Sequence, residues 1–199
     1  MDINFWNTRY KEAEFAYGTE PNDFLKSKIQ NFKSKSKILC LAEGEGRNAV
    51  FVAEHNHVVT AIDYSKEGLN KLQKLAADKN LTIETICVDL NHYKIEENKW
   101  DAIICIFGHF PEPLRQTVFK QVYKGLNKGG VFLMEAYHKD QLNYKTGGPQ
   151  VLELLYSKEE LQMDFSEFEN ITIETSVREI AEGAYHKGTS AVIQVIATK

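Results

Sequence analysis

The sequence is short of cysteine and has no long apolar run. Its three cysteines, Cys40, Cys87 and Cys105, match no zinc-ligand spacing, and their odd number fits no disulfide framework. Each lies in an apolar, strand-like run, so we expect buried, reduced thiols. No apolar stretch approaches the length of a membrane-spanning helix, and the N-terminus has no signal-peptide core. We therefore expect a cytoplasmic protein with no membrane partner.

The chain also lacks the basic surface that is typical of nucleic-acid-binding proteins. Lysine and arginine together number 24, against 28 aspartates and glutamates, which gives a formal net charge of −4. A general nucleic-acid binder would instead show a basic stripe or patch. We therefore expect no nucleic-acid partner, and the sequence does not indicate an oligomeric state.

Short apolar runs alternate with helical patterns through the middle of the chain. The runs at 37–42, 58–63, 81–88, 100–107 and 131–136 are typical of buried strands. Between two of them, Leu114, Val118, Val122 and Leu126 recur every four residues and so share one helix face. This alternation predicts βαβ units and a mainly parallel sheet with helices on both faces.

The two ends of the chain depart from this alternation. Residues 170–180 and 190–198 both read as strands with little helical pattern between them, which predicts an antiparallel hairpin at the sheet edge. Ser157 and Glu160 have capping-box spacing before a short helix. The aromatic-rich N-terminus predicts helices over the top of the domain. We expect a single domain over residues 1–199, with a helical lid at 1–35 and an α/β core at 36–199.

The residues that follow the strands are the candidates for ligand binding, because open α/β sheets bind ligands at the carboxyl ends of their strands. Gly44 and Gly46 follow the first strand, where a sharp turn needs glycine and presents helix N–H groups. Asp63 ends the second strand and suits the two hydroxyls of a ribose. Asp89, or its neighbouring backbone, ends the third and suits the amine of adenine. Together these strand ends predict a nucleoside site.

The glycine pair alone is open to other interpretations. Gly44-x-Gly46-x-x-Ala49 also fits a dinucleotide-binding turn, with Asp63 at the spacing expected for NAD. A tight strand-to-helix turn that binds nothing would give the same glycines. A dinucleotide fold needs a second βαβαβ half, whereas this chain offers two further parallel strands and an antiparallel pair, which disfavours NAD.

The glycine loop also resembles a known motif. The run from Ile38 to Asn48, I-L-C-L-A-E-G-E-G-R-N, resembles motif I of the class I S-adenosylmethionine-dependent methyltransferases, in the tellurite-resistance and thiopurine-methyltransferase-like branch. Other segments resemble the same branch: Trp6-Asn7-x-x-Tyr10, Tyr17-Gly18-x-x-Pro21-Asn22, Phe107-Gly108-His109-Phe110, Gly147-Gly148-Pro149 and Val192 to Lys199. The resemblance implies a Rossmann-like α/β fold with a mostly parallel seven-stranded sheet, an antiparallel last strand and helices on both faces.

The resemblance further implies that the chain binds S-adenosylmethionine, releases S-adenosylhomocysteine, uses no metal, and methylates a small-molecule acceptor such as a thiol or a chalcogen compound. Family members often carry an acid at the position of Cys40 and glycine at that of Ala42, so Glu43 or Glu45 is the expected contact of the methionine amine. A nucleoside-binding relative without turnover is the alternative. The implied cofactor-binding residues are Tyr17, Ala42, Glu43, Gly44, Glu45, Gly46, Arg47, Asn48, Asp63, Tyr64, Ser65, Asp89, Leu90, Ile106, Phe107 and Gly108.

Methyl transfer needs a general base only where the acceptor must lose a proton. His109, after the fourth strand, is the candidate base, and a ring that packs on the cofactor is the alternative. Tyr17 is the second catalytic candidate, because an aromatic face favours a nearby sulfonium cation. The candidate substrate residues are Tyr10, Arg115, Tyr137 and His138. Helix packing is the alternative for Tyr10 and Tyr17, and His186 is expected to be a structural turn residue.

Overall fold

The computed structural model describes residues 3–199, which form a seven-stranded sheet in the order β3-β2-β1-β4-β5-β7-β6. The strands are β1 (Lys37–Leu41), β2 (Val58–Asp63), β3 (Glu84–Cys87), β4 (Trp100–Ile106), β5 (Leu126–Tyr137), β6 (Asn170–Glu182) and β7 (His186–Thr198). Neighbouring strands are parallel except for the pairs β5–β7 and β6–β7, which are antiparallel. The predicted sheet and the predicted hairpin are both confirmed.

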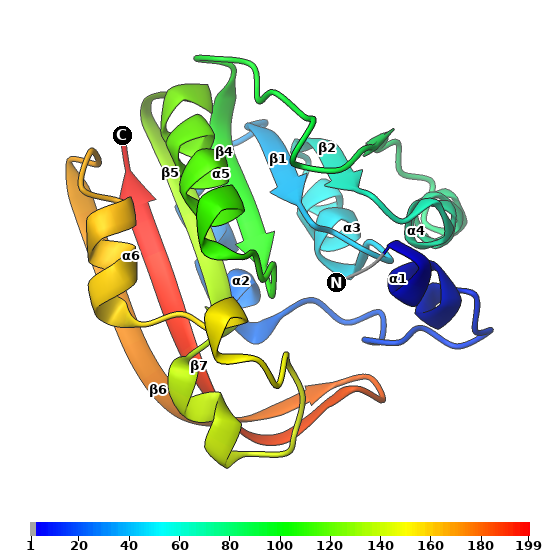
Figure 1. Cartoon of the computed structure of the whole chain (residues 1–199). Helices are drawn as coiled ribbons and strands as arrows, with labels where there is room; N and C mark the ends of the chain where they lie inside the picture. The colour runs from blue at the N-terminus through cyan, green and yellow to red at the C-terminus, as the bar shows by residue number, and fades with distance from the viewer. Residues whose placement is uncertain (1–2) are drawn as a thin grey trace.

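Helices cover both faces of this sheet. They are α1 (Ile3–Tyr10), α2 (Asp23–Lys28), α3 (Arg47–Glu54), α4 (Lys66–Asp78), α5 (Glu112–Gly125) and α6 (Lys158–Asp164). In Figure 1, α5 and α6 lie in front of the sheet, and α2 and α3 lie behind it. Ser157 and Glu160 form the predicted capping box at the start of α6. No helix within residues 3–199 is long and apolar enough to cross a membrane.

Two apolar clusters hold the layers together, one on each face of the sheet. Ile38 and Cys40 of β1 pack in the cluster that contains residues of α2, α3 and α4. Leu39 and Leu41 pack in the cluster that contains residues of α5 and α6. Successive side chains of a strand point to opposite faces, so a strand buried on both sides must be apolar throughout. This explains why the central strands read as unbroken apolar runs.

Three strands begin three or more residues away from their expected starts, and one of them is β7, which begins at His186 rather than at 190. β3 begins only at Glu84, because the backbone N–H of Leu81 donates to Ala76 O and extends the end of α4 instead. β5 begins at Leu126 rather than at 131, because Leu126 already pairs with Trp100 before a shift in register. Gly129, which has a positive φ, therefore lies inside the strand.

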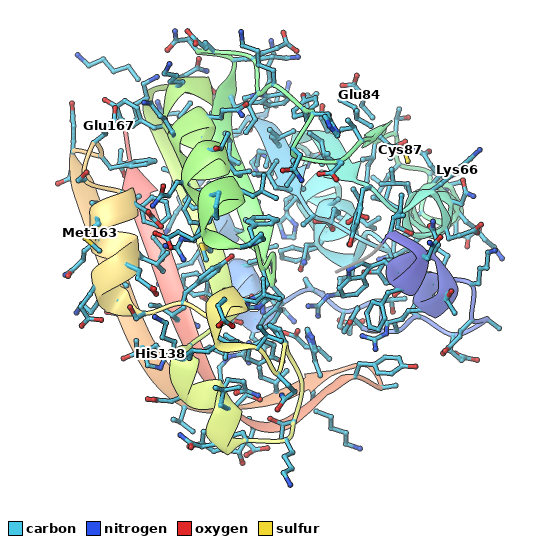
Figure 2. The ribbon with its side chains drawn as sticks, viewed as in Figure 1. Lys66, Glu84, Cys87, His138, Met163 and Glu167 are labelled. Carbon is cyan, nitrogen blue, oxygen red and sulfur yellow. The ribbon has the colours of Figure 1, made fainter. Side chains whose placement is uncertain are left out.

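One expectation about the cysteines is wrong. Cys40 and Cys105 are buried, but Cys87 is exposed. β3 is the edge strand of the sheet, so its residues lack a strand on one side. Figure 2 shows Cys87 near Glu84 and Lys66 at this edge, on the side of the molecule opposite Met163.

The N-terminal segment is tied to the sheet by Asn22, which is completely buried. Its side-chain amide donates to Glu135 Oε1 of β5 at 2.7 Å and to Glu182 Oε1 of β6 at 2.9 Å. Its backbone N–H donates to Asn48 Oδ1 of α3 at 2.9 Å. Asn22 thus joins three elements to the expected lid region. Residues 1 and 2 of that region lie outside the described part of the chain.

Gly46 allows the first strand to turn directly into α3. Its φ of +92° lies in the left-handed region, and a Cβ there would approach Leu72 Cα of α4 to 2.9 Å. Both the turn and the close contact between α4 and the loop therefore require glycine at this position.

We expect Gly46→Ala to lower the free energy of unfolding by about 2–5 kcal/mol, the sum of a left-handed backbone penalty and overpacking against Leu72. Gly129→Ala is the matched control, because Gly129 has a φ of +75° but nothing within 4 Å of an added Cβ. The control should lose only the backbone part, about 1–2 kcal/mol. Urea unfolding of both variants measures the difference, and equal losses would contradict the close-packing account.

Candidate functional site

A cavity of about 490 Å³ lies at the carboxyl ends of the central strands, beneath α1 and beside the tip of the β6–β7 hairpin. Its volume falls in the usual range of roughly 300–1,000 Å³ for small-molecule sites. All of the predicted cofactor-binding residues line it except Gly44 and Ser65. Ser65 instead caps α4, where its hydroxyl accepts from Gly68 N at 3.2 Å and donates to Asn7 at 2.7 Å.

The loop after β1 is held in an unusual backbone conformation. Ala42, Gly44 and Gly46 all have positive φ, of +51°, +62° and +92°. An alanine in the left-handed region is strained, which explains why glycine is common at this position in the family that the loop resembles. The backbone N–H of Glu43 donates to Ile62 O of β2 at 3.1 Å and helps to fix the loop. The loop thus presents its side chains and amides to the cavity.

Asp63 holds this loop against the end of β2. Its Oδ2 accepts from Gly44 N at 2.9 Å, and its Oδ1 accepts from Ser65 N at 2.7 Å. Burial raises the pKa of this carboxyl to about 6, although these backbone N–H groups oppose the shift. Asp63 also lines the cavity, so its remaining lone pairs are placed to meet a ligand.

The two glutamates of the loop have different surroundings. Glu45 is buried, pairs with Lys71 at 2.8 Å, and accepts from the backbone N–H of Ala16 at 2.8 Å. Glu43 accepts from Ala49 N at 2.7 Å, and no basic side chain of residues 3–199 lies within ion-pair distance of it. Burial raises the pKa of Glu43 to about 7. Unlike Glu45, Glu43 is therefore a carboxyl at this cavity without a basic side chain at ion-pair distance within residues 3–199.

Asp89 lines the cavity and is partly buried. Its Oδ1 accepts from the backbone N–H and the side-chain amide of Asn91, both at 2.8 Å. These bonds fix a local turn beside Leu90, which also lines the cavity. The turn is suited to bound polar groups near the surface.

His109 lines the cavity, but both of its ring nitrogens have partners. Nδ1 lies 2.7 Å from Leu154 O and must carry the proton of that hydrogen bond. Nε2 accepts from the backbone N–H of Tyr137 at 3.4 Å. Burial lowers the pKa of this histidine to about 4, so its ring is neutral at physiological pH. This geometry favours a ring that is held in place over one that exchanges protons.

Aromatic rings form part of the wall of the cavity. The ring of His186 lies 4.3 Å from that of Tyr17 and 4.7 Å from that of Phe107, between centroids. Phe107 also lies 4.7 Å from Tyr137, and Tyr10 stacks on Trp6 at 5.4 Å. His186, expected to be a structural turn residue, therefore lines the site together with the predicted Tyr10, Tyr17 and Tyr137.

Two predicted substrate residues do not reach the cavity. Arg115 is buried between α5 and α6, where its Nε lies 2.6 Å from Asp164 Oδ2, so its charge is already paired. His138 lies 3.2 Å from Asp140, beyond the end of β5, and Figure 2 shows it away from α1. Neither residue lines the cavity, so the structure does not bring these two predicted substrate residues to the candidate site. Strand and helix spacing placed them near the correct end of the sheet but did not give the direction of their side chains.

Sequence reasoning missed Arg9 and Tyr185, which also line the cavity. The Arg9 guanidinium lies 4.1 Å from the centre of the Tyr185 ring and 4.4 Å from that of Phe5. It donates to Tyr17 Oη at 2.9 Å, and no carboxylate of residues 3–199 lies within ion-pair distance. The helical spacing of Phe5 and Arg9 could have indicated their shared face, whereas only the fold brings Tyr185 to them.

Similar sequences include methyltransferases. Residues 38–130 match a family model described as a methyltransferase domain. The chain is 29% identical over 105 residues to the probable S-adenosyl-L-methionine-dependent methyltransferase TehB of Haemophilus influenzae strain 10810. That match covers 52% of this chain and 36% of the TehB protein, so it spans little more than a third of this curated relative.

Solved structures show the same fold. The crystal structure of TehB from Haemophilus influenzae aligns with 99% of this chain and 66% of its own, at a TM-score of 0.74 and 19% identity. A protein from a study titled "Conversion of a Disulfide Bond into a Thioacetal Group during Echinomycin Biosynthesis" aligns with 100% of this chain and 89% of its own, at a TM-score of 0.77 and 13% identity. Residues 38–130 thus resemble a methyltransferase domain, and the chain, a seven-stranded sheet with helices on both faces, shares the fold of the TehB crystal structure.

Proposed function

We propose that this chain binds S-adenosylmethionine in the cavity and transfers its methyl group to a small-molecule acceptor. The observation that carries the proposal is Glu43, an acid that faces the cavity without a basic side chain at ion-pair distance within residues 3–199 and with its pKa raised to about 7. A partly buried carboxyl of this kind is stabilised in its ionised form when a ligand brings a positive charge to it. The methionine amine would supply that charge.

Glu43 can also supply the acid that is missing at Cys40, a position that is often acidic in the family. Cys40 is completely buried under the loop, and burial raises the pKa of its thiol, so it holds no charge there. Glu45 is occupied by Lys71 and Ala16. Glu43 is then the acid that takes over the amine contact, and the missing acid at Cys40 does not favour a binding protein without turnover.

The remaining contacts follow from the strand ends. Asp63 would accept the ribose hydroxyls, and the turn at Asp89 and Leu90 would hold the adenine. Arg9 would meet the methionine carboxylate, because its charge has no carboxylate partner within residues 3–199. When bound, S-adenosylmethionine supplies an electrophilic methyl group on a positively charged sulfur.

The aromatic wall suits the transfer of a methyl group from a positively charged sulfur. Tyr17 and Phe107 present ring faces and edges that favour a nearby cation and exclude water. Residues 3–35 would act as a lid, with α1 closing over the nucleoside. The acceptor would enter beside His186 and Tyr137, and the limited cavity volume favours a small thiol, chalcogen or similar compound.

Binding of S-adenosylhomocysteine tests the nucleoside site. We expect calorimetry to show binding of this product at micromolar concentrations and no comparable binding of NAD, and preferential binding of NAD would contradict the proposal. We expect Asp63→Asn to weaken the product's binding by about 1.5–3 kcal/mol through the loss of charge-assisted hydrogen bonds. An unchanged affinity would remove Asp63 from the site.

The pH dependence of this binding tests Glu43. A carboxyl whose pKa is raised to about 7 is mostly protonated at pH 6 and mostly ionised at pH 8, while the ligand's amine stays charged. We therefore expect the affinity for S-adenosylhomocysteine to rise about tenfold between these pH values. Glu43→Gln should weaken binding at pH 8 and flatten its dependence on pH.

Glu45→Gln is the matched control, because it makes the same change two residues away in the same loop. It should keep most of the pH dependence, since Glu45 already has Lys71 as its partner. A flattened profile in Glu45→Gln and a normal one in Glu43→Gln would reverse the assignment of the amine contact.

A further inference from the structure

We propose that His186, oriented by Glu182, is the general base that removes a proton from the methyl acceptor. The inference rests on the proposed methyl-transfer function and adds a catalytic residue to it. It also defines the acceptor chemically, as a compound whose methyl-accepting atom carries a proton at neutral pH.

The two ring nitrogens of His186 have different surroundings. Nδ1 is enclosed by protein and lies 3.7 Å from Glu182 Oε2, with no other partner within residues 3–199. Nε2 also has no hydrogen-bond partner in this part of the chain, and the ring lines the cavity. The Nδ1–Glu182 distance is long for a hydrogen bond, but such contacts commonly tighten when a ligand binds. The ring thus has a carboxylate on one side and the ligand space on the other.

Glu182 is a fixed negative charge. Arg47 pairs with it at 2.6 Å, and the side-chain amide of Asn22 donates to it at 2.9 Å. Although burial opposes ionisation, the neighbouring His186 and Arg47 hold the pKa of Glu182 to about 2. An ionised carboxylate beside Nδ1 favours the tautomer with its proton on that nitrogen, which leaves the lone pair on Nε2.

The ring is also neutral at physiological pH. Burial lowers the pKa of His186, Arg47 and Arg9 lower it further, and Glu182 opposes the shift. The titratable and charged groups around the ring come from α1, the N-terminal loop, α3, the segment after β4, β5, β6 and the hairpin turn: Arg9, Tyr17, Arg47, His109, Tyr137, Glu182 and Tyr185. A neutral imidazole with a free Nε2 can accept a proton.

His109, the base expected from the sequence, lacks this arrangement. Its Nε2 lone pair faces the backbone N–H of Tyr137, and its Nδ1 lies against Leu154 O. To accept a proton, His109 would have to give up a hydrogen bond inside the protein. His186 needs no such loss, so the geometry points to His186 as the base and to His109 as a positioning residue.

The proton and electron balance of the step is simple. The acceptor's lone pair forms a bond to the methyl carbon while the bond from that carbon to sulfur breaks, and its electron pair stays on sulfur as a neutral thioether. The acceptor's proton passes to His186 Nε2, and the resulting imidazolium lies against the ionised Glu182. Water then removes the proton after the product leaves. A carboxylate acceptor brings no proton and would not need this residue.

Two thiol probes test the assignment. 2-Mercaptoethanol is protonated at neutral pH and needs a base, whereas 4-nitrothiophenol is already a thiolate. We expect His186→Gln to lower kcat/KM for 2-mercaptoethanol by about 10²–10⁴-fold, the usual range for general-base catalysis, and to change that for 4-nitrothiophenol far less. A purely structural role of His186 would lower both values equally, and that result would overturn the proposal.

Two further variants serve as comparisons. His138→Gln makes the same change outside the cavity and should leave both values near those of the wild type. His109→Gln, at a positioning residue, should lower both values by a similar factor. If His109→Gln instead lowered kcat/KM for 2-mercaptoethanol alone, His109 would be the general base.

A second readout does not depend on turnover. Long-range proton–nitrogen NMR of the wild-type protein should show His186 as the Nδ1–H tautomer, with a pKa below the usual value for histidine. An Nε2–H tautomer, or a ring protonated at neutral pH, would overturn the assignment.

Calorimetry separates this inference from the proposed function. His186→Gln should still bind S-adenosylhomocysteine, because His186 belongs to the acceptor side. If the wild-type protein binds this product but methylates neither thiol, the base is overturned while the nucleoside site stands. If it does not bind the product, the proposed function fails, and the NMR tautomer still decides whether His186 is set up as a base.

Discussion

The buried ion pair between Arg47 and Glu182 is the contact on which the site depends. It joins the start of α3 to the end of β6 at 2.6 Å, and Asn22 and Glu135 connect it to the N-terminal segment and to β5. Removing one partner of such a pair generally costs about 3–5 kcal/mol, because the other charge stays buried. The glycine loop, the lid and the hairpin are therefore held together by one polar network under the cavity.

The acidic groups of the site fall into two sets that differ in their partners and in their roles. Glu182 and Glu45 have basic partners, Arg47 and Lys71, and hold elements of the fold in place. Glu43 and Asp63 lie at adjacent strand ends without such partners, and burial raises the pKa of each. In the protein without ligand, burial opposes the ionisation of both carboxyls. Their contribution to the free energy of unfolding therefore falls as the pH rises through about 6 to 7. A ligand that brings an ammonium group and hydroxyls offsets this loss, which couples binding to stability.

The sequence predicted the parts of the molecule that local pattern controls. Unbroken apolar runs predicted the buried strands, and the glycines and Asp63 predicted the end of the sheet at which the cavity lies, because backbone conformation limits which residues fit there. Local sequence pattern did not predict the direction in which individual side chains point. Arg115 was assigned to the acceptor but pairs with Asp164, while His186 was assigned to a turn but faces the cavity. These outcomes depend on how α6 and the long β6–β7 hairpin pack, and those contacts join residues far apart in the sequence.

In the proposed site, Glu43 replaces the acid missing at Cys40, and the aromatic wall marks the acceptor side. A crystal structure with S-adenosylhomocysteine bound tests this most directly. The account predicts the ligand's amine within hydrogen-bonding distance of the Glu43 carboxylate, its ribose on Asp63, and its sulfur facing Tyr17, Phe107 and His186. An amine held by another group, or a sulfur turned away from this wall, would contradict it.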